Sequence, residues 1–195
     1  KDLDLYPCAY ANGYFDKLLE TEKINFQAII ETNRGCPFGC KFCYWGSELN
    51  TKYKFFGMER IRKTIEWIRD KKIQYVFCAD ANFGLFKRDL EIAQWLVDAK
   101  NSIGSPEKFR VCYSKNQEDT VFQIGKLLAD NKLEKGVTMA LQSNDKQTLI
   151  NVGRKNIKLS TYASLQKQCN KLNIPTYTEL IWGMPGETFQ SFAEG

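Results

Sequence analysis

Five short apolar runs alternate along this sequence with segments whose apolar residues recur at helical spacing, and this alternation constrains the fold more than any other feature. The runs cover residues 26–31, 73–78, 109–113, 136–141 and 175–181. Steps of three and four, typical of one helix face, mark the stripes between them. These stripes are Met58, Ile61, Ile65 and Ile68; Ile92, Leu96 and Ala99; Val121, Ile124 and Leu128; and Tyr162, Leu165, Cys169 and Leu172. Alternation at this spacing favours βαβ units, and the sequence therefore predicts an α/β fold with a parallel sheet, curled or open.

The chain divides into a lead-in arm and one core. Residues 1–25 show no strong period beyond a short helix expected at 14–20, whereas residues 26–195 carry the whole alternation. A chain of 195 residues suits one domain with a sizeable core. The segment after the fifth run begins another helix and then stops, so we expect the core to be truncated after its fifth strand.

Two residue counts exclude several classes of site. The sequence contains no histidine, which excludes histidine-based triads, two-histidine zinc sites and histidine general bases. It contains seven cysteines, an odd number, and three of them lie close together. A secreted disulfide framework has an even number of cysteines spread along the chain, so we expect a reducing compartment, the cytoplasm, and a metal site.

The charge and hydropathy patterns bear on the partners. The net charge of +5 is mild and scattered, so nucleic acid is permitted but not favoured. The longest apolar runs are far shorter than the roughly 20 residues that a membrane span needs, so a membrane is not expected as a partner.

Polar and glycine-rich segments follow each predicted strand. Because the carboxyl ends of parallel strands meet at one rim, and ligand sites of such folds lie there, we expect these segments to form the site. They are residues 33–46, 79–84, 114–116, 142–145 and 183–187.

Three thiols in the first of these segments, Cys36, Cys40 and Cys43, are spaced to hold one soft metal or cluster. Structural zinc requires a fourth ligand, from cysteine or histidine. The other cysteines, Cys8, Cys78, Cys112 and Cys169, lie on predicted strands, a helix or the arm. Three ligands therefore favour a 4Fe–4S cluster with one open iron, over an incomplete zinc knuckle or accidental clustering.

The pattern CxxxCxxC, with the aromatic Phe42 before its last cysteine, resembles the signature of the radical S-adenosylmethionine (SAM) enzymes. The resemblance implies a partial (β/α)6 barrel of the TIM type, with five parallel strands here and a sixth supplied beyond Gly195. It implies that the open iron is chelated by the amino and carboxylate groups of SAM, which is cleaved to a 5′-deoxyadenosyl radical. A reductant such as flavodoxin or ferredoxin would supply the electron.

The same resemblance assigns SAM contacts along the rim. Asp80 or Asn82, where many members carry Gly-Gly-Glu, would accept from the SAM ammonium, although an Asx turn explains either residue alone. Gln142, Arg154 and Glu179 resemble a polar trio of the oxygen-independent coproporphyrinogen oxidases that contacts the ribose and carboxylate.

The fifth strand and the third add three further residues. Ile181 and Gly183 resemble the strand-five motif beside the adenine, where an ordinary strand–turn–helix is the alternative. Lys115 could add charge at the SAM carboxylate, although a solvated lysine is favoured.

Two flanking segments resemble cobalamin-dependent radical SAM proteins, a class that includes methyltransferases. They are YANGYFDKLLE with the cysteine segment that follows, and DANFGLFKRDLEIA. The resemblance implies cobalamin, held by a domain outside this chain, as a further cofactor of an enzyme whose substrate the sequence does not name.

Two other function classes stay open at this stage. One is an electron-transfer or structural cluster protein without SAM chemistry, against which the polar trio argues. The other is a zinc-stabilised nucleic-acid-binding module built on a group of basic residues. The simpler interpretation is that these residues form the solvent-exposed face of the first core helix. Those residues are Lys52, Lys54, Arg60, Arg62 and Lys63.

Overall fold

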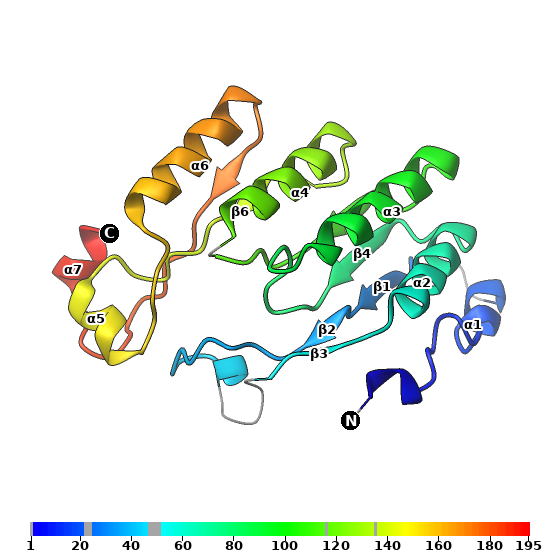
Figure 1. Ribbon diagram of the computed structural model, residues 1–195, viewed down its shortest axis with the longest axis horizontal. Coiled ribbons are helices and arrows are strands. Elements are labelled where there is room, and N and C mark those ends of the chain that lie inside the picture. The colour runs from blue at the N-terminus through cyan, green and yellow to red at the C-terminus, as the bar shows by residue number, and fades with distance from the viewer. Residues whose placement is uncertain (1, 22–24, 47–51, 116, 135) are drawn as a thin grey trace.

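A computed structural model describes residues 2–21, 25–46, 52–115, 117–134 and 136–195 as an α/β protein with parallel strands. The helices are η1 (Leu3–Leu5), α1 (Asp16–Thr21), η2 (Tyr44–Gly46), α2 (Met58–Asp70), α3 (Arg88–Ile103), α4 (Glu118–Asp130), α5 (Lys146–Asn151), α6 (Leu159–Lys171) and α7 (Phe189–Ala193). The strands are β1 (Gln27–Ile30), β2 (Asn33–Arg34), β3 (Lys54–Phe55), β4 (Tyr75–Cys78), β5 (Lys108–Arg110), β6 (Val137–Thr138) and β7 (Thr176–Tyr177). Figure 1 shows α2, α3, α4 and α6 in one row along one side of the strands.

All five predicted strands are present, but they are shorter than expected and form two sheets. β1, β4 and β5 make a parallel sheet with β4 in the centre, and β6 pairs in parallel with β7. Among the residues that the structure describes, no backbone pairing joins β5 to β6. The expected single sheet is therefore divided, with the first three of its strands on one side of the break and the fourth and fifth on the other.

Alternation along the strands directs one face of the sheet to the helices. Ala28 and Ile30 of β1 and Val76 and Cys78 of β4 are buried, whereas Ile29 between them is 62 % exposed. The helical stripes supply the other side of this core, as predicted, with Ile61, Ile65 and Ile68 of α2 and Ile92, Leu96 and Ala99 of α3 all buried. A smaller second core lies between β6 and α6.

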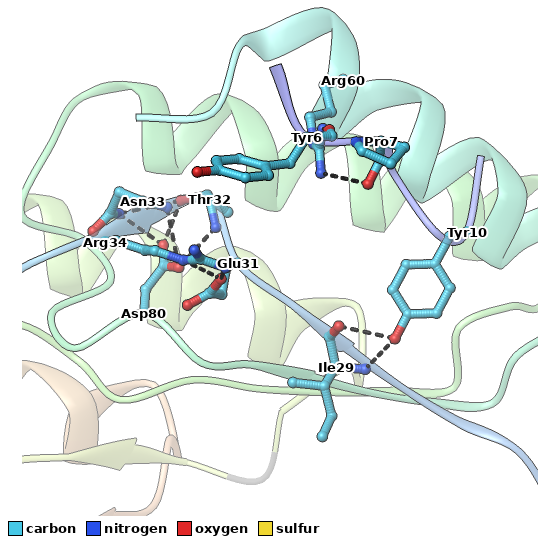
Figure 2. Close-up of polar contacts among 10 residues, drawn as sticks. All are labelled: Tyr6, Pro7, Tyr10, Ile29, Glu31, Thr32, Asn33, Arg34, Arg60 and Asp80. Carbon is cyan, nitrogen blue, oxygen red and sulfur yellow. Dashed lines mark hydrogen bonds and ion pairs between the residues drawn. The ribbon is translucent and has the colours of Figure 1, made fainter. Parts of the chain in front are cut away.

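The N-terminal arm packs along α2 and the free edge of β1. The Tyr10 hydroxyl donates to the Ile29 carbonyl at 2.9 Å and accepts from the Ile29 N–H at 3.0 Å, so it satisfies both groups of an edge strand (Figure 2). The Trp67 indole of α2 donates to Asp16 at 2.9 Å, and Arg60 donates to the Tyr6 carbonyl. The arm therefore covers one edge of the core.

β2, β3 and α5 were not predicted from the sequence. β2 precedes the three motif cysteines, β3 follows them later in the chain, and the two strands form an antiparallel pair. α5 is a short helix capped by the Asp145 carboxylate, which accepts from Thr148 N at 2.7 Å. The basic residues of the nucleic-acid alternative are divided between β3 and α2. Lys52 lies just before β3 and Lys54 lies in it, whereas the others lie on α2. On α2, Arg62 and Lys63 pair with glutamates on the exposed helix face. No helix among the described residues is long and apolar enough to cross a membrane.

A cavity of about 350 Å³ lies at the break between the two sheets. Its lining residues are Tyr75, Lys108, Phe109, Arg110, Leu133, Glu134, Gly136 and Tyr177. Burial raises the pKa of Glu134 to about 8, although a hydrogen bond from the Tyr113 hydroxyl (3.3 Å) and the Arg110 charge both oppose the shift. The ionised carboxylate is therefore poorly accommodated at this position.

We expect Glu134→Gln to stabilise the protein at pH 9 relative to wild type, and to have a smaller effect at pH 5. A raised folded-state pKa gives stability that is complete below the unfolded value of 4.5 and is lost as the pH rises through about 8. The difference in unfolding free energy between variant and wild type should grow by at least about 1 kcal/mol between these pH values. Denaturant titrations measure it, with the exposed Glu91→Gln as control. An equal difference at both pH values would contradict the expectation.

Candidate functional site

A cavity of about 530 Å³ opens at the carboxyl ends of β4, β5 and β6, which is the rim that the sequence predicts. Eight predicted site residues line it: Cys36, Cys40, Phe42, Cys43, Asp80, Asn82, Gln142 and Arg154. Glu179, Ile181 and Gly183 are not among its lining residues. The structure thus brings together the cysteine segment and most of the predicted SAM contacts.

The three cysteines of the motif face this cavity from one loop, residues 36–43, here named the cysteine loop. Cys36 and Cys40 are buried, and Cys43 is half-buried with its N–H donating to the Cys40 carbonyl at 3.0 Å. Within the described part of the chain, no three cysteine or acidic side chains converge closely enough to hold a single metal ion. Zinc holds its thiolates at about 2.3 Å, so it needs closer convergence than a four-iron cluster, which spreads its cysteine ligands more widely. Three thiols around an open cavity fit the cluster better than zinc.

The other four cysteines differ in their surroundings. Cys78 and Cys169 are buried in the core and Cys8 is half-buried against Thr64. Cys112 is exposed and lines the same cavity as the motif. Cys112 is therefore not part of the core.

The cysteine loop is fixed to the end of α5. The Lys41 N–H donates to the Val152 carbonyl at 2.9 Å, and its ammonium donates to the Asn151 carbonyl at 3.0 Å. Gly153 has φ +64°, and a Cβ there would lie 3.2 Å from the Gly39 carbonyl oxygen. A residue with a Cβ would be strained by this left-handed backbone and would have to displace the Gly39 carbonyl. The contact places the residue after Gly153 beside the thiols.

That residue is Arg154, whose guanidinium is held by backbone carbonyls at the exit of β6. It donates to Leu141 O at 3.2 Å and to Ala140 O at 2.6 Å, and also to the Asn156 side chain at 2.6 Å. Its Nη1 lies 4.0 Å from Cys40 Sγ. A fixed cation therefore stands at the edge of the cavity, where a carboxylate group of a ligand would be attracted.

Gln142 joins the exits of β6 and β7. Its N–H donates to the Glu179 carbonyl and its carbonyl accepts from the Ile181 N–H, both at 2.8 Å. Its φ of +70° is rare for a residue with a side chain and marks local strain, which often accompanies a functional site. The predicted trio is thus partly assembled, because the backbone of Glu179 adjoins Gln142 while its own side chain is exposed. Gly183 also has a positive φ, +83°.

Asp80 and Asn82, the alternatives for the ammonium, lie in different surroundings. The buried Asp80 carboxylate accepts from Thr32 N at 2.7 Å, from the Thr32 hydroxyl, and from the Asn33 side chain at 2.8 Å (Figure 2). Burial raises its pKa, and these hydrogen bonds oppose that shift. Asn82 donates to Cys36 Sγ at 3.2 Å and to the Tyr53 hydroxyl at 3.3 Å. Asp80 is occupied with backbone and neighbouring side chains, whereas Asn82 contacts a motif thiol.

Lys115 lies at the cavity and is not a solvated side chain, contrary to the favoured expectation. Its ammonium is 3.9 Å from Cys40 Sγ and 4.3 Å from the centre of the Phe38 ring. Burial and the charge of Arg154 lower the pKa of Lys115, whereas the thiols of Cys40 and Cys36 raise it. The sequence signal was its place directly after a predicted strand at the rim.

The family comparison decides between the interpretations. The family model described as "Radical SAM superfamily" matches residues 30–194. The chain belongs to the radical SAM superfamily. This membership confirms the radical SAM interpretation, and with it a 4Fe–4S cluster and SAM as cofactors. It does not support the electron-carrier or zinc-module alternatives.

Two curated relatives are each 43% identical to the chain over 192 residues. One is the 2-(S-pantetheinyl)-carbapenam-3-carboxylate methyltransferase of Streptantibioticus cattleyicolor, and the other is the cobalamin-dependent radical SAM methyltransferase TokK of Streptomyces tokunonensis. The matches cover 97% of this chain but only 28% of each relative. Both relatives are enzymes, which agrees with the prediction of an enzyme.

Solved structures show the same fold at low sequence identity. The radical SAM methyltransferase TsrM from Kitasatospora setae matches with a TM-score of 0.62 and 18% identity, over 85% of this chain and 32% of that one. The cobalamin-dependent SAM radical enzyme OxsB matches with a TM-score of 0.58 and 17% identity, over 92% of this chain and 27% of that one. The α/β arrangement is therefore that of a radical SAM core.

We expect Gly153→Ala to lower the stability of the protein by about 1–2 kcal/mol and to reduce the iron that the chain retains after reconstitution. The left-handed backbone alone costs a residue with a Cβ about that much, and the Gly39 contact adds displacement of the cysteine loop. Gly104→Ala is the matched control, because its φ is +82° and a Cβ there would contact nothing within 4 Å. Denaturant titration and iron per chain measure the two effects. Equal iron retention in the two variants would show that the Gly39 contact is unimportant.

Proposed function

We propose that this chain is the radical SAM core of a cobalamin-dependent methyltransferase that transfers a methyl group to an unactivated carbon. The observation that carries the proposal is the meeting of three motif thiols, a fixed arginine and a rim amide at one cavity. The likeness over 97% of this chain to two enzymes named as methyltransferases supports the reaction class. Cobalamin would be held by a domain outside this chain, as the name of one relative suggests.

The residues of the cavity divide the work of holding the cofactors. Cys36, Cys40 and Cys43 would hold the 4Fe–4S cluster, which when bound supplies an electron for the reductive cleavage of SAM to a 5′-deoxyadenosyl radical. Arg154 would attract the SAM carboxylate. Asn82 is the better candidate for the ammonium, because the Asp80 carboxylate is already occupied by Thr32 and Asn33.

The remaining predicted residues would form the nucleoside side of the site. Gln142 and Glu179 would contact the ribose hydroxyls, for which an amide and a carboxylate are suited. Ile181 would form an apolar wall for the adenine, and Gly183 would let the backbone approach it. Phe42, which is 39 % exposed beside the cavity, would exclude water above the cluster.

The architecture belongs to the same proposal. Residues 1–25 would be the arm that leads into the core, and residues 26–195 the core itself. The row of helices outside parallel strands supports a partial (β/α)6 barrel, with a sixth strand supplied from outside the chain.

A one-electron donor such as flavodoxin or ferredoxin would reduce the cluster. The oxygen-sensitive open iron favours a reducing compartment, and we place the protein in the cytoplasm.

Replacement of any motif cysteine by alanine should abolish the 4Fe–4S absorbance after anaerobic reconstitution, because each thiolate supplies one of three ligands. Cys112→Ala is the matched control, since its thiol lines the same cavity. Iron and sulfide analysis with absorbance spectra measures the outcome. A motif variant that retains a full cluster would contradict the ligand assignment, and loss of the cluster from Cys112→Ala would contradict the open iron.

In the full-length reconstituted protein, Arg154→Met should weaken SAM binding about tenfold or more and slow release of 5′-deoxyadenosine. A hydrogen bond to a charged group contributes about 1.5–3 kcal/mol. Equilibrium binding of SAM measures the effect, with iron content to show that the cluster is retained and Arg62→Met on the exposed face of α2 as control. Unchanged affinity with a full cluster would remove Arg154 from the site.

A further inference from the structure

Three nitrogen donors lie against the sulfur atoms of the cysteine loop, and they differ in charge. The neutral amide of Asn82 is 3.2 Å from Cys36 Sγ. Two cations stand near Cys40 Sγ, Lys115 at 3.9 Å and Arg154 at 4.0 Å. Positive charge is thus concentrated at one of the three motif thiols.

Lys115 differs from Arg154 in what else it contacts. The Arg154 guanidinium donates to two backbone carbonyls and to Asn156. The Lys115 ammonium rests on the Phe38 ring, and within the described ranges it forms no ion pair with a carboxylate. Its charge is therefore balanced by no acidic side chain there and acts on the thiol beside it.

The backbone that carries Lys115 is firmly placed. Ser114 N donates to the Phe83 carbonyl at 2.8 Å, and Phe83 N donates to the Cys112 carbonyl at 2.8 Å, which extends the parallel pairing beyond β5. The segment that contains Phe83 is held in turn by the Asp89 carboxylate, which accepts from Gly84 N at 2.8 Å. Lys115 is also half-buried, so solvent screens its charge less than it would at the surface.

We propose that Lys115 is a positioning residue that raises the reduction potential of the cluster held by Cys36, Cys40 and Cys43, by placing a positive charge against the Cys40 sulfur. Reduction adds one electron, taken from a one-electron donor such as dithionite, and changes the cluster from the 2+ to the 1+ state with no bond made or broken. A nearby cation stabilises the state that carries more negative charge, and net charge and hydrogen bonds to sulfur are known controls of cluster potential. The proposal rests on the cluster assignment above.

The test is a potentiometric titration of the full-length reconstituted protein without SAM, followed by electron paramagnetic resonance of the reduced cluster. Lys115→Met removes the charge and keeps an unbranched side chain that can lie on Phe38. We expect its equilibrium constant of reduction to fall about tenfold, which is about 59 mV for one electron. Lys115→Arg should restore most of the wild-type value. Lys126→Met, an exposed lysine of α4 that pairs with Asp130, should leave the value unchanged.

Each outcome decides between the proposals. A full cluster in Lys115→Met with the wild-type potential would overturn this inference and leave the proposed function standing. A potential that falls only when SAM is present would also overturn it, because the charge would then act on the SAM carboxylate. If Lys115→Met fails to hold a cluster, Lys115→Gln carries the same titration. Absence of a cluster from the reconstituted wild type would instead refute the proposed function, and this inference with it.

Discussion

The buried carboxylate of Asp80 is the contact on which the position of the cysteine loop depends. It lies at the exit of β4, the central strand, and accepts hydrogen bonds from Thr32 and Asn33, which come directly before that loop. A carboxylate is stable in such a place only when its oxygens are paired, and an unpaired one costs more free energy than the hydrogen bonds provide. The loop therefore begins at a fixed point of the three-stranded sheet.

The far end of the same loop is attached to the other half of the molecule. Lys41 and Gly39 contact the Asn151–Gly153 segment, which follows β6 and precedes Arg154. The cysteine loop thus bridges the two sheets across the break between β5 and β6, and the cavity that holds the thiols lies where the bridge crosses. The positions of the thiols and of Arg154 depend on one another for this reason.

The spacing of apolar residues predicted most of the fold, and the cysteine motif predicted part of the site. The apolar stripes of α2, α3 and α4, such as Ile61, Ile65 and Ile68, are largely buried as expected, because helical spacing reports a single contact face. The α6 stripe is buried only at Leu165 and Cys169, and Leu172 at its end is exposed. The division into two sheets was not predicted, since alternation shows where strands lie and not which strands pair. The placement of Lys115 was also missed. A lone lysine after a strand is usually solvated, and only the fold brings Phe38 and Cys40 to it.

The two halves of the site extend from hydrophobic cores of different size. Asp80, Asn82 and Lys115 extend from the three-stranded sheet and its large core, whereas Gln142, Glu179 and Ile181 extend from β6 and β7, whose core contains six buried residues. Local stability follows the amount of buried contact, so we expect the β6–β7 half to open more readily than the three-stranded half. A ligand that touches both halves adds contacts across the break. It therefore stabilises the state in which the two halves are in contact, by an amount that grows with its affinity and concentration. In the site proposed above, SAM would lie between the cysteine loop and Gln142 and would add contacts across the break between β5 and β6.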